Sequence, residues 1–384
     1  MISKLIHYAN LLDCLGKSKT NARDKMLVAL ARRTLHWLPL ARMGYFPTAM
    51  DLTASGADQT AFHEQAACAT RKLFGRRVFV RAVVEVSNYC RENCHYCGMR
   101  RDNRELSRGR ADLEELGETL VHHRPGAVTD INIQTGEDPV AAHAVVLPLV
   151  RILRRETQLG ISVGLGTHDY PVYRELKEAG ASIYILKYET ADALYYRQKQ
   201  APGSLSERVK HIRWLAAQGW HVSSGFIAGL PGQDVSHLLE NHRLANQLPL
   251  RGCSVSPFVP GSGTPLTDAQ PSDVETALNC MAALRLMRVH WVIPAVSALN
   301  LARGENGYRR GLRAGANLVT INMTPRSLQK EYPIYRRDRF IMDEAGVMEA
   351  LTAENLVPSM ESLADFHRQG GAETITGPEV VMSS

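Results

Sequence analysis

The stretch RVFVRAVVEVSNYCRENCHYCGMRR (Arg77–Arg101) joins two features that together decide the fold. Its first half is short, rich in β-branched residues and ended by turn residues, which predicts a β-strand. Its second half is a polar loop that holds three of the seven cysteines of the chain, Cys90, Cys94 and Cys97. A strand that runs directly into three clustered thiols predicts a sheet with a metal or redox site at the end of its first strand.

The same order of strand, polar loop and helix repeats through residue 325. The strand-like pieces are TDINIQTGEDP (129–139), ISVGLGTHD (161–169), SIYILKYETAD (182–192), HVSSGFIAGLPGQ (221–233), GCSVSPFVPGSGTP (252–265), VIPAVSAL (292–299) and NLVTINMTP (317–325). Between them, apolar residues recur at three- and four-residue spacing, which predicts helices. This alternation predicts an α/β fold, a (βα)8 TIM-type barrel that is full or nearly full, with its active site at the carboxyl ends of the strands.

The chain of 384 residues divides into three expected parts. Residues 1–75 form an N-terminal helical extension, residues 76–345 form the βα barrel, and residues 346–384 form a C-terminal extension and tail that is loosely held from about residue 365. An apolar content of 45% and a charged content of 22% are typical of a globular chain rather than a disordered one.

Composition also excludes several classes of partner. The net charge of +6 is spread along the chain without a concentrated basic run, so we expect no nucleic-acid partner. No apolar run approaches the length of a membrane span, and the first residues lack the apolar core and cleavage site of a signal peptide. With an odd number of clustered cysteines, we expect a cytoplasmic protein with reduced thiols and no membrane partner.

The cysteine spacing restricts the metal site. Two cysteines would suggest a redox pair, and four would suggest structural zinc. A [4Fe–4S] cluster usually takes four thiolates, so three leave one iron free for a ligand that is not protein. Two alternatives stay open: a zinc site completed by His95 or a distant residue, and cysteines that are only structural. The chain contains no second CxxC to complete a zinc pair, and the loop is polar, whereas inert thiols are buried.

Six further motifs, QTGEDP, YETAD, GLPGQ, PFVPGSGTPL, IPA and NMTP, follow the cysteine loop. In this order the chain resembles the radical S-adenosylmethionine (SAM) superfamily, specifically its biotin-synthase-like subgroup. It looks most similar to the radical SAM maturases of [FeFe]-hydrogenase, and more distantly to methylornithine synthase and biotin synthase. The resemblance covers residues 50–345. It implies a [4Fe–4S] cluster, SAM bound at the open iron, and an electron donor such as flavodoxin or ferredoxin.

The resemblance also implies roles for individual residues. Those expected to hold the cluster or SAM are Cys90, Cys94 and Cys97 as ligands, Tyr96 and Ile227 at the adenine, Thr135, Gly136 and Glu137 at the amino group, Glu189 at the ribose or amino end, and Arg208 at the carboxylate. A forked guanidinium suits the last of these tasks. Alternatives remain: Tyr96 as a core residue, Arg208 as a solvated helix residue, and TGEDP as an ordinary turn.

Substrate is expected deeper in the barrel. The candidate catalytic residues are polar and near predicted strand ends: His168, Tyr188, Asn322 and Thr324, with Asp169 beside them. Each could instead be a satisfied core or rim residue. Thr167 and the pair Lys187–Tyr188 differ from the residues that the resemblance to the hydrogenase maturase implies in the substrate cavity, which puts that activity in doubt.

The chain is therefore expected to be a radical SAM enzyme with a single cluster. It would take hydrogen from a small polar molecule, amino-acid-like or containing a thioether. Between Cys97 and Cys253 there is no cysteine, which disfavours a sulfur-donating second cluster. The alternatives are a metallocofactor maturase of the hydrogenase type and, from another class, a non-catalytic iron–sulfur or zinc scaffold.

Overall fold

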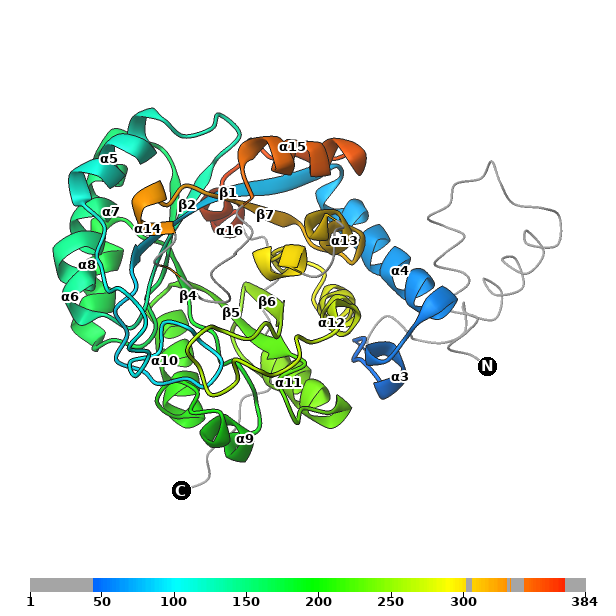
Figure 1. The fold of residues 1–384 in the computed structure, drawn as a ribbon. Helices are drawn as coiled ribbons and strands as arrows, with labels where there is room; N and C mark the ends of the chain where they lie inside the picture. The colour runs from blue at the N-terminus through cyan, green and yellow to red at the C-terminus, as the bar shows by residue number, and fades with distance from the viewer. Residues whose placement is uncertain (1–43, 302–305, 330–331, 333–341, 370–384) are drawn as a thin grey trace, which may run out of the picture.

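A computed structural model describes residues 44–301, 306–329, 332 and 342–369. Its centre is a parallel sheet whose seven main strands run in the order β6-β5-β4-β3-β2-β1-β7 (Figure 1). The strands are β1 (Arg77–Ser87), β2 (Asp130–Thr135), β3 (Gly160–Gly164), β4 (Ile183–Ile185), β5 (His221–Ala228), β6 (Gly252–Pro257) and β7 (Leu318–Asn322). All six pairings between these neighbours are parallel. The short strand β8 (Val357–Pro358) pairs with the start of β1.

A short extended segment connects the two edge strands of this sheet. Val292 forms a parallel bridge to Gly252 of β6, and Pro294 forms one to Leu318 of β7. The Val292 N–H donates to the carbonyl of Arg251 at 3.0 Å. The ring of pairings is therefore closed, and the predicted TIM-type barrel is confirmed.

The prediction of a full strand at 292–299 is wrong beyond the bridge. The 3-10 helix η3 (Ser297–Leu301) occupies the second half of that stretch. Pro294 has no N–H to donate to a ladder, so it limits how far the strand can extend.

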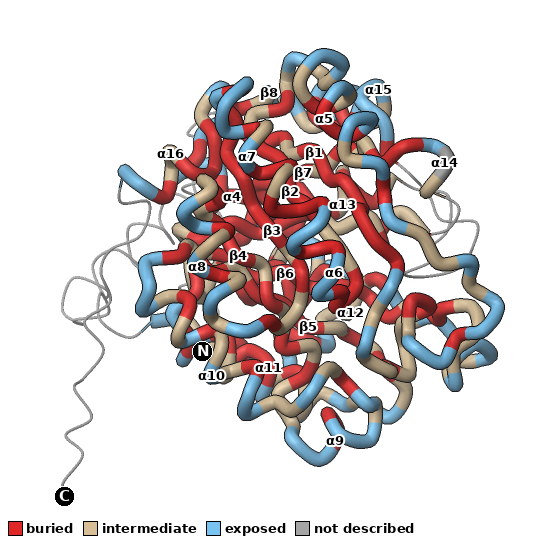
Figure 2. Tube along the Cα trace, turned by 90° about the vertical axis from the view of Figure 1, so that its left-hand side faces the viewer, coloured by how far each residue is buried: buried red, intermediate tan, exposed pale blue. Residues whose placement is uncertain are grey.

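Helices surround the strands, and Figure 2 shows the buried strands inside a more exposed outer layer. The larger crossover helices are α5 (Leu113–His122), α7 (Leu147–Glu156), α8 (Tyr170–Ala179), α10 (Leu205–Ala217), α11 (Val235–Gln247), α12 (Val274–Met287) and α13 (Gly307–Arg313). The shorter helical pieces are α6 (Pro139–Ala141), the π-helical turn η2 (Ala142–Val146), α9 (Ala193–Gln198) and α14 (Arg326–Gln329). Asp112, Ser204, Asp234 and Asp273 cap the first turns of their helices through side-chain oxygens. No helix in the described ranges is both long enough and apolar enough to cross a bilayer.

The amino-terminal part is helical where the structure describes it. Helices α3 (Ala49–Leu52) and α4 (Gly56–Phe74) precede β1, and α4 lies against α12 and α13 (Figure 1). Thr70 of α4 and Arg285 of α12 both donate to the carbonyl of Gly315, at 3.1 and 2.8 Å. Residues 1–43 of the predicted helical extension lie outside the described ranges.

Of the tail expected from about residue 365, only residues 365–369 lie within the described ranges, and residues 370–384 lie outside them. After α15 (Glu344–Ala353) and β8, helix α16 (Leu363–Arg368) begins at Ser362, whose side chain accepts from the Asp365 N–H. Leu363 and His367, four residues apart on one face, are buried. The Leu363 N–H donates to Asp130 of β2 at 2.9 Å. Helix α16 therefore lies at the amino-terminal end of the barrel.

Candidate functional site

The cysteine loop directly follows β1, as predicted, and brings its three thiols near one another. Cys94 is buried, Cys90 and Cys97 are half-buried, and all three are free of disulfides. Burial raises the pKa of Cys94 well above its usual value, and the charges of Cys97 and Cys90 raise it further. Burial likewise raises the pKa of Cys97 to about 12. Thiols of this kind become thiolates when a metal binds them.

The geometry of the thiols is compatible with a cluster. Within the described part of the chain, no three His, Cys, Asp or Glu side chains surround a single point as one ion would require. A [4Fe–4S] cluster places each thiolate on a separate iron, so its ligands need not converge on one point. The donor set, three soft sulfurs on one loop, fits such a cluster.

Backbone amides point at the sulfur atoms. The Glu137 N–H donates to Cys90 Sγ at 3.3 Å. A Cβ at Gly136 would lie 2.1 Å from the carbonyl oxygen of Tyr89, so only glycine lets the β2 loop approach the cysteine loop this closely. The predicted segment Thr135–Glu137 therefore lies against the cysteine loop, and its amides can tune the charge of the sulfurs.

Two charged residues that the sequence analysis missed hold this loop in shape. Arg108 donates to the carbonyls of Asn88, Met99 and Arg100 at 2.5, 2.9 and 2.6 Å. Asp138 is buried and binds Arg110 through both carboxylate oxygens, at 2.7 and 3.0 Å. Asp138 occurs in TGEDP, for which the sequence analysis assigns roles only to Thr135, Gly136 and Glu137 or predicts an ordinary turn. Its position before Pro139, at the start of α6, was the available signal.

Glu137 and Arg208, both predicted at the SAM site, form a buried ion pair. Arg208 Nη2 lies 2.8 Å from Glu137 Oε1. Burial alone would lower the pKa of Arg208, but the charge of Glu137 more than offsets this and raises it. The other Glu137 oxygen is 3.4 Å from Arg91 Nε. Arg208 Nε is buried without a hydrogen-bond partner among the described residues, so the guanidinium has a donor left for a ligand carboxylate.

Tyr96 and Ile227, the two residues expected at the adenine, pack against the same side chains. Both contact one small apolar cluster built on Tyr195, Leu230 and Phe258. The Tyr96 hydroxyl is buried and has no hydrogen-bond partner in the described chain. This cluster offers a flat apolar contact beside the cysteine loop.

Glu189 lies near both the cysteines and Arg208. Its backbone has φ 61°, a left-handed conformation that costs energy for a residue other than glycine. Its N–H donates to Gly225 and its carbonyl accepts from Ile227, which holds it there. Burial raises the pKa of Glu189, and the charges of Lys187 and Arg208 lower it. The carboxylate therefore lies among the other predicted SAM contacts.

Of the four candidate catalytic residues, Asn322 and Thr324 lie together at the barrel interior. Thr324 Oγ1 donates to Glu85 Oε2 at 3.1 Å, and Asn322 Nδ2 lies 3.4 Å from the same oxygen. The Asn322 side chain also accepts from the Thr324 N–H at 2.9 Å. Glu85 of β1, absent from the predicted set, is the centre of this group.

His168 and Tyr188 do not join that group. The His168 ring contacts the carbonyl of Leu165 at 3.1 Å, and burial lowers its pKa. The Tyr188 hydroxyl donates to the carbonyl of Asn241 in α11, on the outer side of the sheet, at 2.7 Å. Neither side chain lines the barrel cavity. Consecutive residues of an extended chain point to opposite faces, so Lys187 faces inward and Tyr188 outward. Asp169 is the residue before α8, away from the cavity.

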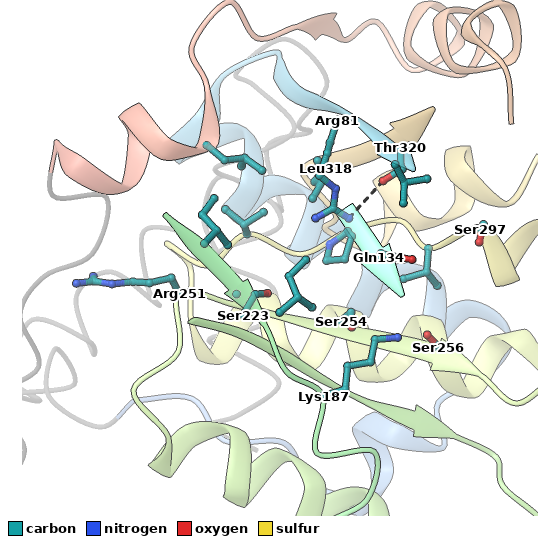
Figure 3. Close-up of a pocket in the computed structure, with 18 of the residues that line it drawn as sticks. Arg81, Gln134, Lys187, Ser223, Arg251, Ser254, Ser256, Ser297, Leu318 and Thr320 are labelled. Atoms are coloured by element: carbon teal, nitrogen blue, oxygen red, sulfur yellow. Dashed lines mark hydrogen bonds between the residues drawn. The ribbon is translucent and has the colours of Figure 1, made fainter. Parts of the chain in front are cut away.

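The barrel interior contains a cavity of about 170 Å³ (Figure 3). The polar residues that line it include Arg81, Glu85, Gln134, Lys187, Ser254 and Ser256. The spacing of two between Ser254 and Ser256, and of four between Arg81 and Glu85, was a sequence signal for a shared inward face. The cavity extends from the level of Glu85 and Asn322 down to Leu363 and His367 of α16.

Comparisons with known proteins agree with this site. Residues 84–245 match the family described as the radical SAM superfamily. The chain is 32% identical over 267 residues to the [FeFe] hydrogenase maturase subunit HydE of Thermotoga maritima, covering 69% of this chain and 76% of that protein. It is 31% identical over 275 residues to 3-methylornithine synthase of Methanosarcina barkeri, covering 69% and 75%.

A solved structure, methylornithine synthase (PylB), superposes with a TM-score of 0.73 at 26% identity, covering 86% of this chain and 98% of that one. Biotin synthases match at lower identity, such as 22% over 285 residues for that of Acetivibrio thermocellus, covering 73% of this chain and 88% of that protein. The predicted order of resemblance is confirmed. The chain therefore belongs to the radical SAM superfamily, whose enzymes use a [4Fe–4S] cluster and S-adenosylmethionine.

Proposed function

We propose that this radical SAM enzyme holds a single [4Fe–4S] cluster through Cys90, Cys94 and Cys97 and takes hydrogen from a small polar substrate in the barrel cavity. Cys90, Cys94 and Cys97 would hold the cluster, which would supply the electron for reductive cleavage of SAM, so that its 5′-deoxyadenosyl group could take the hydrogen. The electron comes from a small carrier such as flavodoxin or ferredoxin.

One observation carries this proposal: Glu137 connects the cysteine loop to the SAM-binding residues. Its N–H reaches Cys90 Sγ at 3.3 Å, and its carboxylate binds Arg208 at 2.8 Å. Glu137 therefore contacts both a cluster ligand and the arginine that binds the SAM carboxylate. Both contacts lie at the carboxyl end of the strands, above the cavity, where this fold places its active sites.

The protein's own part in the reaction is to bind, orient and exclude water. Arg208 and Glu137 bind the charged ends of SAM, and the cluster around Tyr96 and Ile227 packs on its adenine. The cavity beneath is small, which limits both the substrate and the water that can reach a reactive radical. Asn322, held with Thr324 by Glu85, supplies a polar contact at its upper wall.

The single-cluster part of the proposal rests on the two remaining barrel cysteines. Cys253 and Cys280 are fully buried, and neither lines the cavity. Burial raises the pKa of Cys253 to about 12, and of Cys280 further still. These are features of packed thiols rather than of ligands for a second cluster.

A second candidate is a metallocofactor maturase, favoured by the 32% identity to a hydrogenase maturase subunit. Against it stands Lys187, which lines the cavity where the resemblance to that maturase implies another residue. A non-catalytic scaffold is the third candidate.

Replacing one cysteine tests the proposal. Anaerobically reconstituted protein with dithionite should release 5′-deoxyadenosine from SAM, and Cys94→Ala should abolish both this product and the brown cluster absorbance. Cys253→Ala, which removes a buried thiol outside the site, is the matched control and should retain both. Absence of 5′-deoxyadenosine from fully reconstituted wild-type protein would favour the scaffold instead.

A further inference from the structure

Two cations that line the barrel cavity form no ion pair with a carboxylate of the described residues. Arg81 of β1 and Lys187, two residues after β4, both line the cavity, and Figure 3 shows both side chains directed into it. In the described chain, no carboxylate forms an ion pair with either side chain. Arg251, at the edge of the cavity, points away from it in Figure 3.

Arg81 is not explained by the stability of the barrel. Its Nε is buried without a hydrogen-bond partner among the described residues, and its Nη2 reaches Thr320 Oγ1 only at 3.4 Å. Asp130, the residue opposite it on β2, forms no ion pair with it, although its charge partly offsets the effect of burial on the pKa of Arg81. Asp130 Oδ2 accepts from the N–H of Leu363 at 2.9 Å and the hydroxyl of Thr129 at 3.0 Å, and Oδ1 has no hydrogen-bond partner among the described residues. Burial lowers the pKa of Arg81 to about 10, so it still carries its charge at neutral pH. A buried charge without a partner destabilises a fold.

Lys187 lies on another wall of the same cavity. Its ammonium points towards Ser256 in Figure 3, and it makes no hydrogen bond within the described chain. Among the described residues, the carboxylate that lines the cavity is Glu85, which contacts Thr324 and Asn322. His221 and His367 also line the cavity, but burial lowers their pKa values to about 4 and 3, so they are neutral. Within the described part of the chain, the inward charges are therefore those of Arg81, Lys187 and Glu85.

We propose that the cavity binds a small dicarboxylic acid or its amino derivative, with one carboxylate on Lys187 and the other on Arg81. This rests on the proposed function, because it assigns the ligand of the same cavity. A guanidinium fork binds a carboxylate through two hydrogen bonds, and an ammonium binds it as a point charge. The volume of about 170 Å³ is below the roughly 300–1,000 Å³ of drug-sized ligand pockets, so the acid is short.

The two assignments differ in depth. Arg81 pairs in register with Thr320 of β7, below the level of Val83 and Asn322. Lys187 lies beyond the carboxyl end of β4, nearer the cysteine loop. The carboxylate on Arg81 therefore anchors the far end of the ligand, and the carboxylate on Lys187 holds the end closer to SAM.

Thermal unfolding of the full-length, anaerobically reconstituted protein with SAM tests this. The probes are the straight-chain dicarboxylates from malonate to pimelate, each compared with the monocarboxylate of equal chain length at equal ionic strength. At least one dicarboxylate should raise the unfolding temperature more than its monocarboxylate, because a ligand that binds only the folded state stabilises it. Its Kd from the concentration dependence should rise at least tenfold in Lys187→Met and in Arg81→Met. If no dicarboxylate exceeds its monocarboxylate, the inference is wrong.

Controls separate this outcome from a general loss of charge or of fold. Lys210→Met and Arg104→Met remove the same charges from exposed positions and should leave the affinity unchanged. Without ligand, Arg81→Met should unfold at no lower temperature than wild type, since it removes an unpaired buried charge. A large drop in the unfolding temperature of both unliganded Met variants, with a dicarboxylate Kd like that of wild type in each, would assign these residues a structural role and overturn the inference.

The measurement needs no turnover, so the two proposals fail separately. Protein that binds a dicarboxylate but releases no 5′-deoxyadenosine would overturn the proposed function alone. Protein that cleaves SAM but shows no preference for dicarboxylates would overturn the ligand assignment alone.

Discussion

Charged side chains form ion pairs at the cofactor end of the barrel, whereas two cations in the cavity beneath form none with the described residues. At the cofactor end, Glu137 lies between Arg208 and Arg91, and Asp138 binds Arg110 through both oxygens. In the cavity beneath, Arg81 and Lys187 have no carboxylate within the described chain.

The contrast separates two uses of a buried charge. Paired charges at the cofactor end connect the cysteine loop, the β2 loop and helix α10 into one frame. Breaking one partner of such a pair leaves an uncompensated charge and typically costs about 3–5 kcal/mol. The two cations below form no ion pair with a carboxylate of the described residues, and the contact of Arg81 with Thr320 is long, at 3.4 Å. Mutations in the frame of paired charges should therefore lower the stability of the fold, whereas mutations of the two cavity cations should lower the affinity for ligand.

The largest expected effect is on the frame. Gly136→Ala places a Cβ 2.1 Å from the carbonyl oxygen of Tyr89, which is backbone and cannot swing away. We expect a loss of about 3 kcal/mol in the free energy of unfolding, at the upper end for overpacking. Denaturant unfolding of the protein measures this loss, and iron content after reconstitution should fall with it. Gly126→Ala is the matched control, because a Cβ there meets nothing within 4 Å. Equal stability of the two variants would mean that the β2 loop does not press on the cysteine loop.

A smaller effect is expected where the frame meets the ligand. Arg208→Ala should weaken SAM binding by about 2 kcal/mol, or roughly 30-fold, as expected for losing a hydrogen bond between charged groups. Equilibrium dialysis with labelled SAM measures this affinity. Lys210→Ala removes a charge from the exposed face of the same helix and should bind SAM like wild type. Unchanged SAM affinity in Arg208→Ala would remove this residue from the site and leave its pairing with Glu137 purely structural.

The frame was easier to predict from the sequence than the pocket, for a physical reason. Few structures other than a cluster-binding loop require the spacing of Cys90, Cys94 and Cys97. The strands could be predicted from short apolar runs that alternate with helical patterns. The errors in the fold came where one residue or a distant contact overrides that pattern. Pro294 shortens a strand, and the buried contacts of Leu363 and His367 form helix α16 where the sequence shows no strong helical pattern.

The pocket depends on which way each side chain points. Lys187 and Tyr188 are neighbours in the sequence. Because side chains of an extended chain alternate between its two faces, the sequence predicts that one of them faces inward but not which one. His168 looked like a catalytic residue, but a carbonyl three residues away satisfies its ring. Arg81 and Glu85 could have been found, since residues four apart on a strand share a face. Polar residues at such positions in a barrel strand are a better signal for a pocket than polar residues at strand ends.

The smallest expected effect concerns the amino-terminal end of the cavity, where His221 and His367 lie with ring centroids 5.0 Å apart. Burial lowers the pKa of His367 to about 3, and the charges of His221 and Arg251 would lower it further. The folded state therefore keeps His367 neutral while the unfolded chain takes up a proton below about pH 6.5. The unfolded state binds more protons in that window, so stability should fall as pH drops from 6.5 towards 3 and be unaffected above it.

His367→Phe should recover about 1 kcal/mol of the stability lost between pH 7 and pH 5.5, measured by urea unfolding at each pH. His123→Phe, at an exposed site, controls for the added ring. The same pH dependence in His367→Phe and wild type would place the acid sensitivity elsewhere, and would leave α16 as a packed cover with no part in it.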